Sequence, residues 1–250
     1  MILAACPPLY TSPMQVKLVA RTPNPQQVIY GAMHQDYSSD FVCDSRDQWP
    51  SESKCGEIIV NRLLKGDRGH YGCLEHPSIT LGCKGFPHSV MQQARTHRVG
   101  VSFDVQSFRY TSQSVIEVAT SDREVEEVFY FRPIGSYTDR QGKAYEYDQA
   151  RQDQDKARCV EAARYYALSV HSGLSEEHAR DMLPFNYRQH FIVSFNLRSV
   201  LHFMDLRSKK DAQLEIQNLC QQIWPHVKAW APDVAKWYED TRMGKARLAP

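Results

Sequence analysis

The segment Ser78–Arg98 reads SITLGCKGFPHSVMQQARTHR, and the rest of the chain is interpreted outward from it. The part up to Phe86 has the composition of a strand. Pro87 then stands where a helix can begin, since proline fits the first helical turn. Apolar residues follow at helical spacing and predict a helix running toward Arg98; they are Val90, Met91 and Ala94. A strand therefore leads into a helix that ends in basic residues.

Further elements are predicted on both sides of this segment. Alternating residues over 15–20 predict a half-buried strand, and aromatic and β-branched residues over 190–195 predict another. Residues 38–53 indicate an irregular excursion, and residues 124–132 and 143–147 are expected to pair around a turn at Gln141-Gly142. Pro225, Pro232 and the basic tail Arg242–Arg247 indicate a fraying end. Apolar spacing and capping residues predict helices over 25–34, 58–64, 87–98, 152–172, 175–184, 198–206 and 212–224.

The composition is that of an ordinary globular protein. Apolar residues make up 42% and charged residues 24% of the 250 residues, so neither disorder nor a fibrous repeat is indicated. Lysine and arginine number 30 against 29 acidic residues, and the net charge of +1 gives no global field for nucleic acid or an anionic membrane. We expect one domain spanning residues 1–250.

The cysteines and the N-terminus favour a cytoplasmic protein. The seven cysteines are scattered and never spaced as Cys-x-x-Cys, which argues against a disulfide framework and a zinc site. Met1–Cys6 is apolar, but it is too short and lacks the basic residues of a signal peptide. No apolar run approaches the ~20 residues that a membrane-spanning helix needs.

The densest cluster of reactive side chains lies at the end of the helix predicted over 87–98. The sequence QARTHR at 93–98 is followed, after eight residues, by SFRY at 107–110. Guanidinium groups bind phosphate oxygens bidentately and a serine hydroxyl adds a donor, so these side chains suit a phosphate pocket. The alternative, on composition alone, is that Arg95 and Arg98 are solvated helix charges and Ser107 is a turn residue.

This cluster resembles the signature of the flavin-dependent thymidylate synthases, which is Arg-His-Arg followed about seven residues later by Ser and commonly by Arg-Tyr. In this chain Thr96 stands directly before His97, Arg95 lies one place earlier, and the spacer to Ser107 is eight residues. Either Arg95 or Thr96 therefore takes the role of the first signature arginine. Val105 replaces the polar residue that the family carries two places before the serine.

A second block further along the chain resembles the same family. Residues 179–184, ARDMLP, are similar to the family's Ala-Arg-x-x-Leu-Pro, and NLRS at 196–199, HF at 202–203 and LRS at 206–208 match the series that follows. Arg198 and His202 are four residues apart, so they share one helical face and can address one ligand. Without the resemblance, Arg180 and Arg207 are explained equally well as cations favoured at helix C-termini. The resemblance covers roughly residues 15–230.

The resemblance implies an α+β fold, in which a mixed or antiparallel central sheet is flanked by helices in a single domain. It implies reductive methylation of dUMP to dTMP without a protein nucleophile. Methylenetetrahydrofolate is the expected carbon donor, FAD the redox cofactor and NADPH the reductant. FAD and dUMP are expected to stack in sites shared between the subunits of a homotetramer, and no metal is expected.

The site residues of the family carry over to the matching positions of this chain. FAD is expected to contact Arg95, His97, Arg98, Asn196, Arg198 and His202. The substrate dUMP is expected to contact Gln93, Thr96, Gln106, Ser107, Phe108, Arg109, Arg180 and Arg207. Arg207 is the expected catalytic residue, because the resemblance places it at the pyrimidine, where it stabilises negative charge as the ring is activated.

Other classes of protein remain alternatives on the residues alone. Aromatic residues between the arginines, such as Phe103 and Tyr110, would suit a module that binds single-stranded nucleic acid, although the near-zero net charge argues against it. The ten histidines, which include His70 and His76, make a metallohydrolase the second alternative, but no His-x-x-x-His spacing occurs. The chain has no Pro-Cys dipeptide, no Gly-x-Ser-x-Gly elbow and no Gly-x-Gly-x-x-Gly motif, which argues against a covalent nucleophile and a Rossmann domain.

Overall fold

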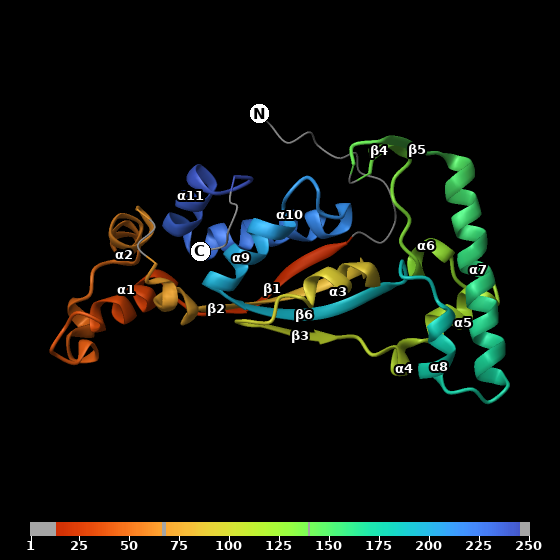
Figure 1. The fold of residues 1–250 in the computed structure, drawn as a ribbon. Coiled ribbons are helices and arrows are strands. Elements are labelled where there is room, and N and C mark those ends of the chain that lie inside the picture. The colour runs from red at the N-terminus through yellow and green to blue at the C-terminus, as the bar shows by residue number, and fades with distance from the viewer. Residues whose placement is uncertain (1–13, 67–68, 140, 246–250) are drawn as a thin grey trace. The chain divides into compact units, whose positions relative to one another are not determined.

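The computed structural model describes residues 14–66, 69–139 and 141–245 (Figure 1). The chain packs as two compact units. The first unit contains Lys84–Met91 and Val105–His190, and the second contains Gln15–Cys83, Gln92–Asp104 and the residues from Phe191 onward. Met1–Cys6 and Arg247, which entered the expectations for the two ends of the chain, lie outside the described residues.

A four-stranded sheet has the order β1-β2-β6-β3. Its strands are β1 (Gln15–Arg21), β2 (Ser78–Pro87), β6 (Arg188–Asn196) and β3 (Val101–Val105). Between β2 and β6, Thr80 bonds to Ser194 and Gly85 to His190. Between β6 and the ends of β3, His190 bonds to Gln106 and Asn196 to Gly100. Residue numbers rise on one strand as they fall on its neighbour, so β2, β6 and β3 are antiparallel. The α+β fold with a central antiparallel sheet is thereby confirmed.

Helices of the second unit pack on this sheet and on one another. They are α1 (Pro25–Gln35), α2 (Glu52–Ile59) with a following π-helix (Val60–Leu64), α9 (Leu197–Arg207), α10 (Leu214–Trp230) and α11 (Pro232–Thr241). Helix α10 lies against β1 (Figure 1), since the Val16 amide donates to Gln222 Oε1 at 3.0 Å and the Trp230 indole to Thr22 O at 2.9 Å. Two short 3₁₀ helices, Val42–Gln48 and Tyr71–Glu75, complete this unit.

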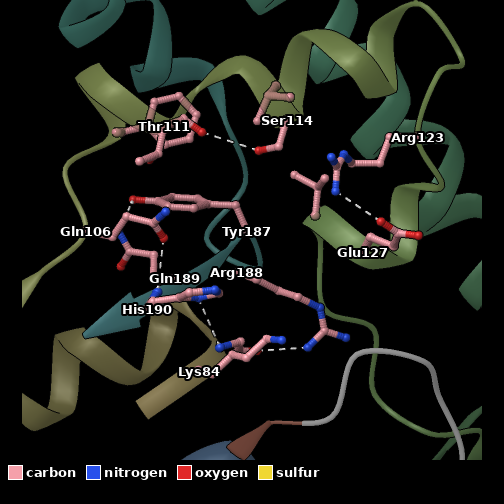
Figure 2. Close-up of a pocket in the computed structure, with 14 residues that line it drawn as sticks. Lys84, Gln106, Thr111, Ser114, Arg123, Glu127, Tyr187, Arg188, Gln189 and His190 are labelled. Carbon is pink, nitrogen blue, oxygen red and sulfur yellow. Dashed lines mark hydrogen bonds and ion pairs between the residues drawn. The ribbon is translucent and has the colours of Figure 1, made fainter. Parts of the chain in front are cut away.

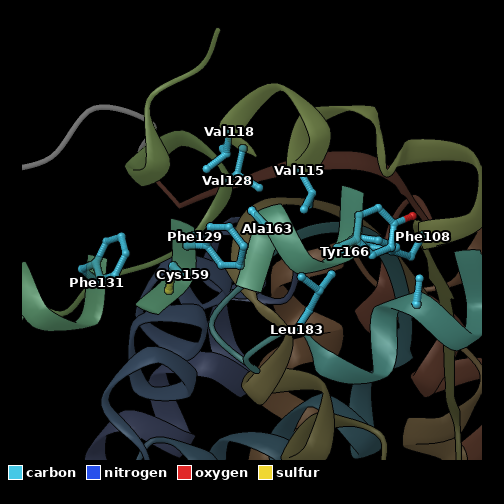
Figure 3. Packing of buried hydrophobic residues seen from close by; sticks show 11 residues of the cluster. Phe108, Val115, Val118, Val128, Phe129, Phe131, Cys159, Ala163, Tyr166 and Leu183 are labelled. Atoms are coloured by element: carbon cyan, nitrogen blue, oxygen red, sulfur yellow. The ribbon is translucent and has the colours of Figure 1, made fainter. Parts of the chain in front are cut away.

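The first unit is built on the long helix α7 (Gln149–His171), which was predicted over 152–172. Its buried face includes Cys159, Ala163 and Tyr166, which pack in one apolar cluster with residues of neighbouring elements (Figure 3). Those elements are α4 (Phe108–Thr111), α5 (Gln113–Ala119), α6 (Val125–Val128) and α8 (Glu176–Ala179). A 3₁₀ helix, Arg180–Met182, follows α8. Helix α3 (His88–Ala94) follows β2.

Three expectations about individual elements were wrong. Strand β5 (Ala144–Tyr147) pairs with β4 (Gly135–Thr138) and not with 124–132, because part of that segment forms α6. The helix predicted to reach Arg98 ends at Ala94. Helix α10 continues through Pro225, and α11 follows it, because burial of Trp224, Val227 and Trp230 outweighs the ~3 kcal/mol that an interior proline costs.

Two properties of the described residues bear on the class of protein. None of the described helices is long and apolar enough to cross a membrane. Within the same residues, no group of three or more His, Cys, Asp or Glu side chains is placed to hold a metal ion.

Candidate active site

A contact between Arg207 and His97 joins the two sequence blocks within the second unit. Arg207 is the last residue of α9, and its Nε donates to His97 Nε2 at 3.0 Å. Its Nη2 donates to Gln93 O at 3.1 Å and to Thr96 Oγ1 at 2.8 Å. Because α3 ends at Ala94, residues 95–98 form a turn whose polar atoms are available to this guanidinium. The hydrogen bonds hold the guanidinium fork in one orientation.

The start of α9 is fastened to the loop that follows Arg98. Asn196 caps the helix, its Oδ1 accepting from the Ser199 amide at 2.8 Å. The Ser199 hydroxyl donates to Val99 O at 2.7 Å, and the Asn196 amide donates to Gly100 O at 3.0 Å. Gly100 has φ +66, a backbone conformation that favours glycine. Gly100 was not among the residues expected at the site, although a glycine just after a basic cluster is a signal for a tight turn.

His97 is neutral and carries a proton that no described residue accepts. Burial, with Arg207 and then His202 nearby, lowers the pKa of His97 to about 4. The Arg207 Nε–H can only donate, so Nε2 of the imidazole accepts and the ring proton is on Nδ1. Nδ1 is buried and has no hydrogen-bond partner among the described residues. A buried donor without an acceptor is costly, so this geometry favours a ligand atom that accepts from Nδ1.

The lowered pKa of His97 predicts an acid-sensitive contribution to stability. Below the ordinary pKa of about 6.5, the unfolded chain binds a proton at this ring that the folded chain does not bind until about pH 4. Unfolding free energy should therefore fall as the pH drops through that window, by at most about 1.4 kcal/mol per unit. Denaturant unfolding at pH 5 and pH 7.5 should show a larger loss in the wild type than in His97→Gln, which cannot titrate; equal losses would contradict this.

Arg207 is a half-buried cation without a carboxylate partner among the described residues. Burial lowers the pKa of its guanidinium, and the groups that it contacts are all uncharged. A charge held away from water without a counterion is unfavourable. An anionic group, or one that develops negative charge, would therefore be stabilised beside Arg207.

Thr96, and not Arg95, lies against Arg207. The Thr96 hydroxyl accepts from Arg207 Nη2 and donates to Gln93 O at 2.7 Å. Arg95 and Arg98 are exposed and make no hydrogen bond or ion pair with any described residue. At the start of the signature, the residue that contacts Arg207 is therefore Thr96, through its hydroxyl. Arg95 and Arg98 both remain available to a ligand.

Two further residues expected at FAD lie on α9. The His202 ring meets His97 edge to face, with ring centroids 5.1 Å apart. Arg198 Nη1 forms an ion pair with Glu75 Oε1 at 2.6 Å. Both partners of that ion pair are 39% exposed, so it is weak enough to exchange for a ligand anion.

The remaining expected residues lie in the first unit. Arg109 Nη1 forms a long ion pair with Glu177 Oε2, at 3.4 Å, and Arg180 directly follows α8. Ser107 occupies the position before α4. Gln106 Oε1 accepts from the His190 amide at 3.2 Å, and Phe108 packs in the apolar cluster. The expected contacts of Gln106 and Phe108 with dUMP stay predictions.

Comparison with known sequences identifies the family. The family described as "Thymidylate synthase complementing protein" matches residues 17–233. A flavin-dependent thymidylate synthase of Halobacterium salinarum is 32% identical over 257 residues, covering 95% of this chain and 100% of the relative. A flavin-dependent thymidylate synthase of Haloarcula marismortui is 30% identical over 250 residues, again covering 95% of this chain and 100% of the relative.

Solved structures share the fold. Thymidylate synthase X from Helicobacter pylori, a structure with FAD and dUMP, matches with a TM-score of 0.65 and 21% identity over 91% of this chain and 98% of that one. The UMP/dUMP methylase PolB from Streptomyces cacaoi, bound with 5-Br dUMP, matches with a TM-score of 0.69 and 21% identity, covering 96% of this chain and 98% of that one. The family match and the two archaeal relatives show that the chain belongs to the flavin-dependent thymidylate synthase family.

Proposed function

We propose that the Arg207–His97 contact marks the place where the flavin and the pyrimidine of dUMP meet in this chain. The observation that carries the proposal is a half-buried, uncompensated guanidinium bonded to a neutral histidine whose Nδ1–H has no described acceptor. The uracil ring gains negative charge when it is activated, and Arg207 is arranged to stabilise that charge. The reaction is the reductive methylation of dUMP to dTMP.

The residues of the second unit fit a flavin dinucleotide. His97 offers a buried Nδ1–H, and the exposed Arg95 and Arg98 offer guanidinium forks for phosphate oxygens. Asn196, Arg198 and His202 complete the set at the first turns of α9. FAD, when bound, supplies the electrons taken from NADPH that convert the methylene unit of methylenetetrahydrofolate to a methyl group.

The residues proposed for the nucleotide are assigned within each unit separately. In the second unit Gln93, Thr96 and Arg207 suit the pyrimidine. In the first unit Ser107, Arg109 and Arg180 offer donors suited to a phosphate. Thymidylate synthase X from Helicobacter pylori was crystallised with FAD and dUMP, which supports the proposal that this chain binds both ligands. We further propose that the chain acts as one catalytic domain, because the family match spans both units. The homotetramer is proposed from the resemblance to the family alone.

A cytoplasmic location belongs to the same proposal. The six cysteines among the described residues all carry free thiols, which a reducing compartment preserves. Burial raises the pKa of five of these thiols, so they are poor nucleophiles at neutral pH; they are Cys55, Cys73, Cys83, Cys159 and Cys220.

A spectral titration tests the proposal. The purified protein is loaded with FAD, and its flavin absorbance, near roughly 450 nm for an oxidised flavin, is followed as dUMP is added. Stacking of uracil on the flavin should shift the band with a saturating dependence on dUMP, and turnover with NADPH and methylenetetrahydrofolate should give dTMP. If the flavin absorbance of the FAD-loaded protein does not change when dUMP is added, the proposal that FAD and dUMP share one site is contradicted.

His97→Ala should weaken flavin binding. The substitution removes the buried Nδ1–H that has no described acceptor. A hydrogen bond to a charged acceptor contributes about 1.5–3 kcal/mol, or roughly tenfold or more in affinity. FAD affinity measured by fluorescence quenching reports the effect. His34→Ala, at an exposed histidine of the same unit, is the control and should bind FAD like the wild type. Unchanged affinity in His97→Ala would remove His97 from the flavin site.

A further inference from the structure

A polar cavity of about 540 Å³ lies entirely within the first unit (Figure 2). Its lining comes from the end of β2, from α4 and α5, from the residues around α6, and from the start of β6. Figure 2 shows Tyr187 between Thr111 on one side and His190 on the other, with Arg188 and Lys84 beyond. Neither His97 nor Arg207 belongs to this unit.

The cavity carries an excess of positive charge. Lys84, Arg123 and Arg188 line it against a single carboxylate, that of Glu127. Arg123 is neutralised, since it pairs with Glu117 at 2.6 Å and with Glu127 at 3.1 Å. Lys84 and Arg188 have no ion-pair partner in the part of the chain that the structure describes. Two uncompensated cations therefore remain.

The Arg188 guanidinium is held by carbonyl oxygens and not by a carboxylate. Its Nε donates to Glu126 O at 3.0 Å and its Nη1 to Gly85 O at 2.8 Å, and its guanidinium lies 5.4 Å from the centroid of the Tyr130 ring. Burial lowers the pKa of this guanidinium. Carbonyl oxygens orient the fork but do not cancel its charge, so a half-buried arginine held in this way is predisposed to bind an anion.

A ring donor adds to the two cations. The Gly85 amide donates to His190 Nδ1 at 3.4 Å, so Nδ1 accepts and the ring proton is on Nε2. Two cations and an imidazole N–H match a group with several acceptor oxygens and a double negative charge.

We propose that this cavity is a binding site for a phosphate-bearing ligand, held by Lys84 and Arg188 with the His190 ring as a further donor. The volume is large enough for more than a bare phosphate. The ligand is either a free phosphate compound or the phosphorylated part of NADPH, for which the proposed active site assigns no residues. The proposal does not depend on the function assigned to Arg207.

Calorimetric titration with inorganic pyrophosphate tests the site. The FAD-loaded protein is first saturated with dUMP, so that arginines that bind the substrate phosphate are occupied. Lys84→Met should raise the pyrophosphate Kd about tenfold, since one charge-assisted contact is lost. Lys84 is exposed, so its substitution leaves the fold intact. Lys143→Met, at an exposed lysine of the same unit outside the cavity, is the control and should match the wild type.

Steady-state kinetics then identify the source of the phosphate. If Lys84→Met also raises the KM for NADPH, with kcat and the KM for dUMP unchanged, the occupant is the reductant. If only the pyrophosphate Kd rises, the occupant is a free phosphate compound. A Kd in Lys84→Met equal to that of Lys143→Met overturns the site. If dUMP fails to bind, the pyrophosphate Kd values of Lys84→Met and Lys143→Met are compared without dUMP. Failure of the active-site assignment is thereby distinguished from failure of the phosphate site.

Discussion

Arg207→Ala is expected to retain FAD and to lose dTMP formation, with kcat lowered by about 10²–10³-fold, the cost of removing one preorganised donor from a developing negative charge. The hydrogen bonds from Arg207 to His97, Gln93 and Thr96 fix its orientation before substrate arrives, so little reorganisation is needed in the transition state. Alanine removes both the charge and the fork. The flavin keeps its other contacts and should remain bound.

Two further variants separate charge from geometry. Arg207→Lys keeps the positive charge but cannot make three directed hydrogen bonds from one plane, so it should recover only a small part of kcat. Arg62→Ala, at an exposed arginine of the same unit, should leave both flavin content and turnover unchanged. Flavin absorbance and dTMP formation are measured on the same preparations. Loss of flavin in Arg207→Ala would assign this residue to the cofactor.

Local sequence patterns predicted the elements that carry the site. The strand from Ser78, the helix after Pro87 and the long helix α7 follow from apolar spacing and proline position, which act over a few residues. The Arg207–His97 contact could not be derived in this way, because 110 residues separate the two and only tertiary packing brings them together. Resemblance to a family supplied their expected roles, His97 at FAD and Arg207 at dUMP, but not which atoms meet.

The missed features depend on long-range packing. Pro225 indicated an end to the helix, whereas buried tryptophans on either side hold α10 together through it. The choice between Arg95 and Thr96 also escaped the sequence, since it depends on where α3 ends: a helix that stopped at Arg98 would have turned different side chains toward Arg207. Spacing along the chain leaves such an ending uncertain by a few residues.

Gly100→Ala is expected to destabilise the protein and to weaken FAD binding together. With φ at +66, an L side chain is strained by about 1–2 kcal/mol. The added methyl would also overlap the Asn196 carboxamide, which caps α9, and the Ser199 hydroxyl, which fastens the loop to the start of α9. Overpacking of this kind costs about 1–3 kcal/mol more. A thermal midpoint several degrees lower and a weaker FAD affinity should appear in the same variant.

Gly173→Ala separates the two causes. Gly173 also has a positive φ, +95, but an added methyl would meet no atom within 4 Å, so its substitution carries the backbone strain alone. It should lower the thermal midpoint less than Gly100→Ala and leave FAD affinity unchanged. Equal losses of stability in both variants, with FAD affinity intact, would mean that the loop at Gly100 shifts to accommodate the added methyl at no further cost in free energy. The positions of Asn196 and Arg198 at the start of α9 would then not depend on the turn that follows Arg98.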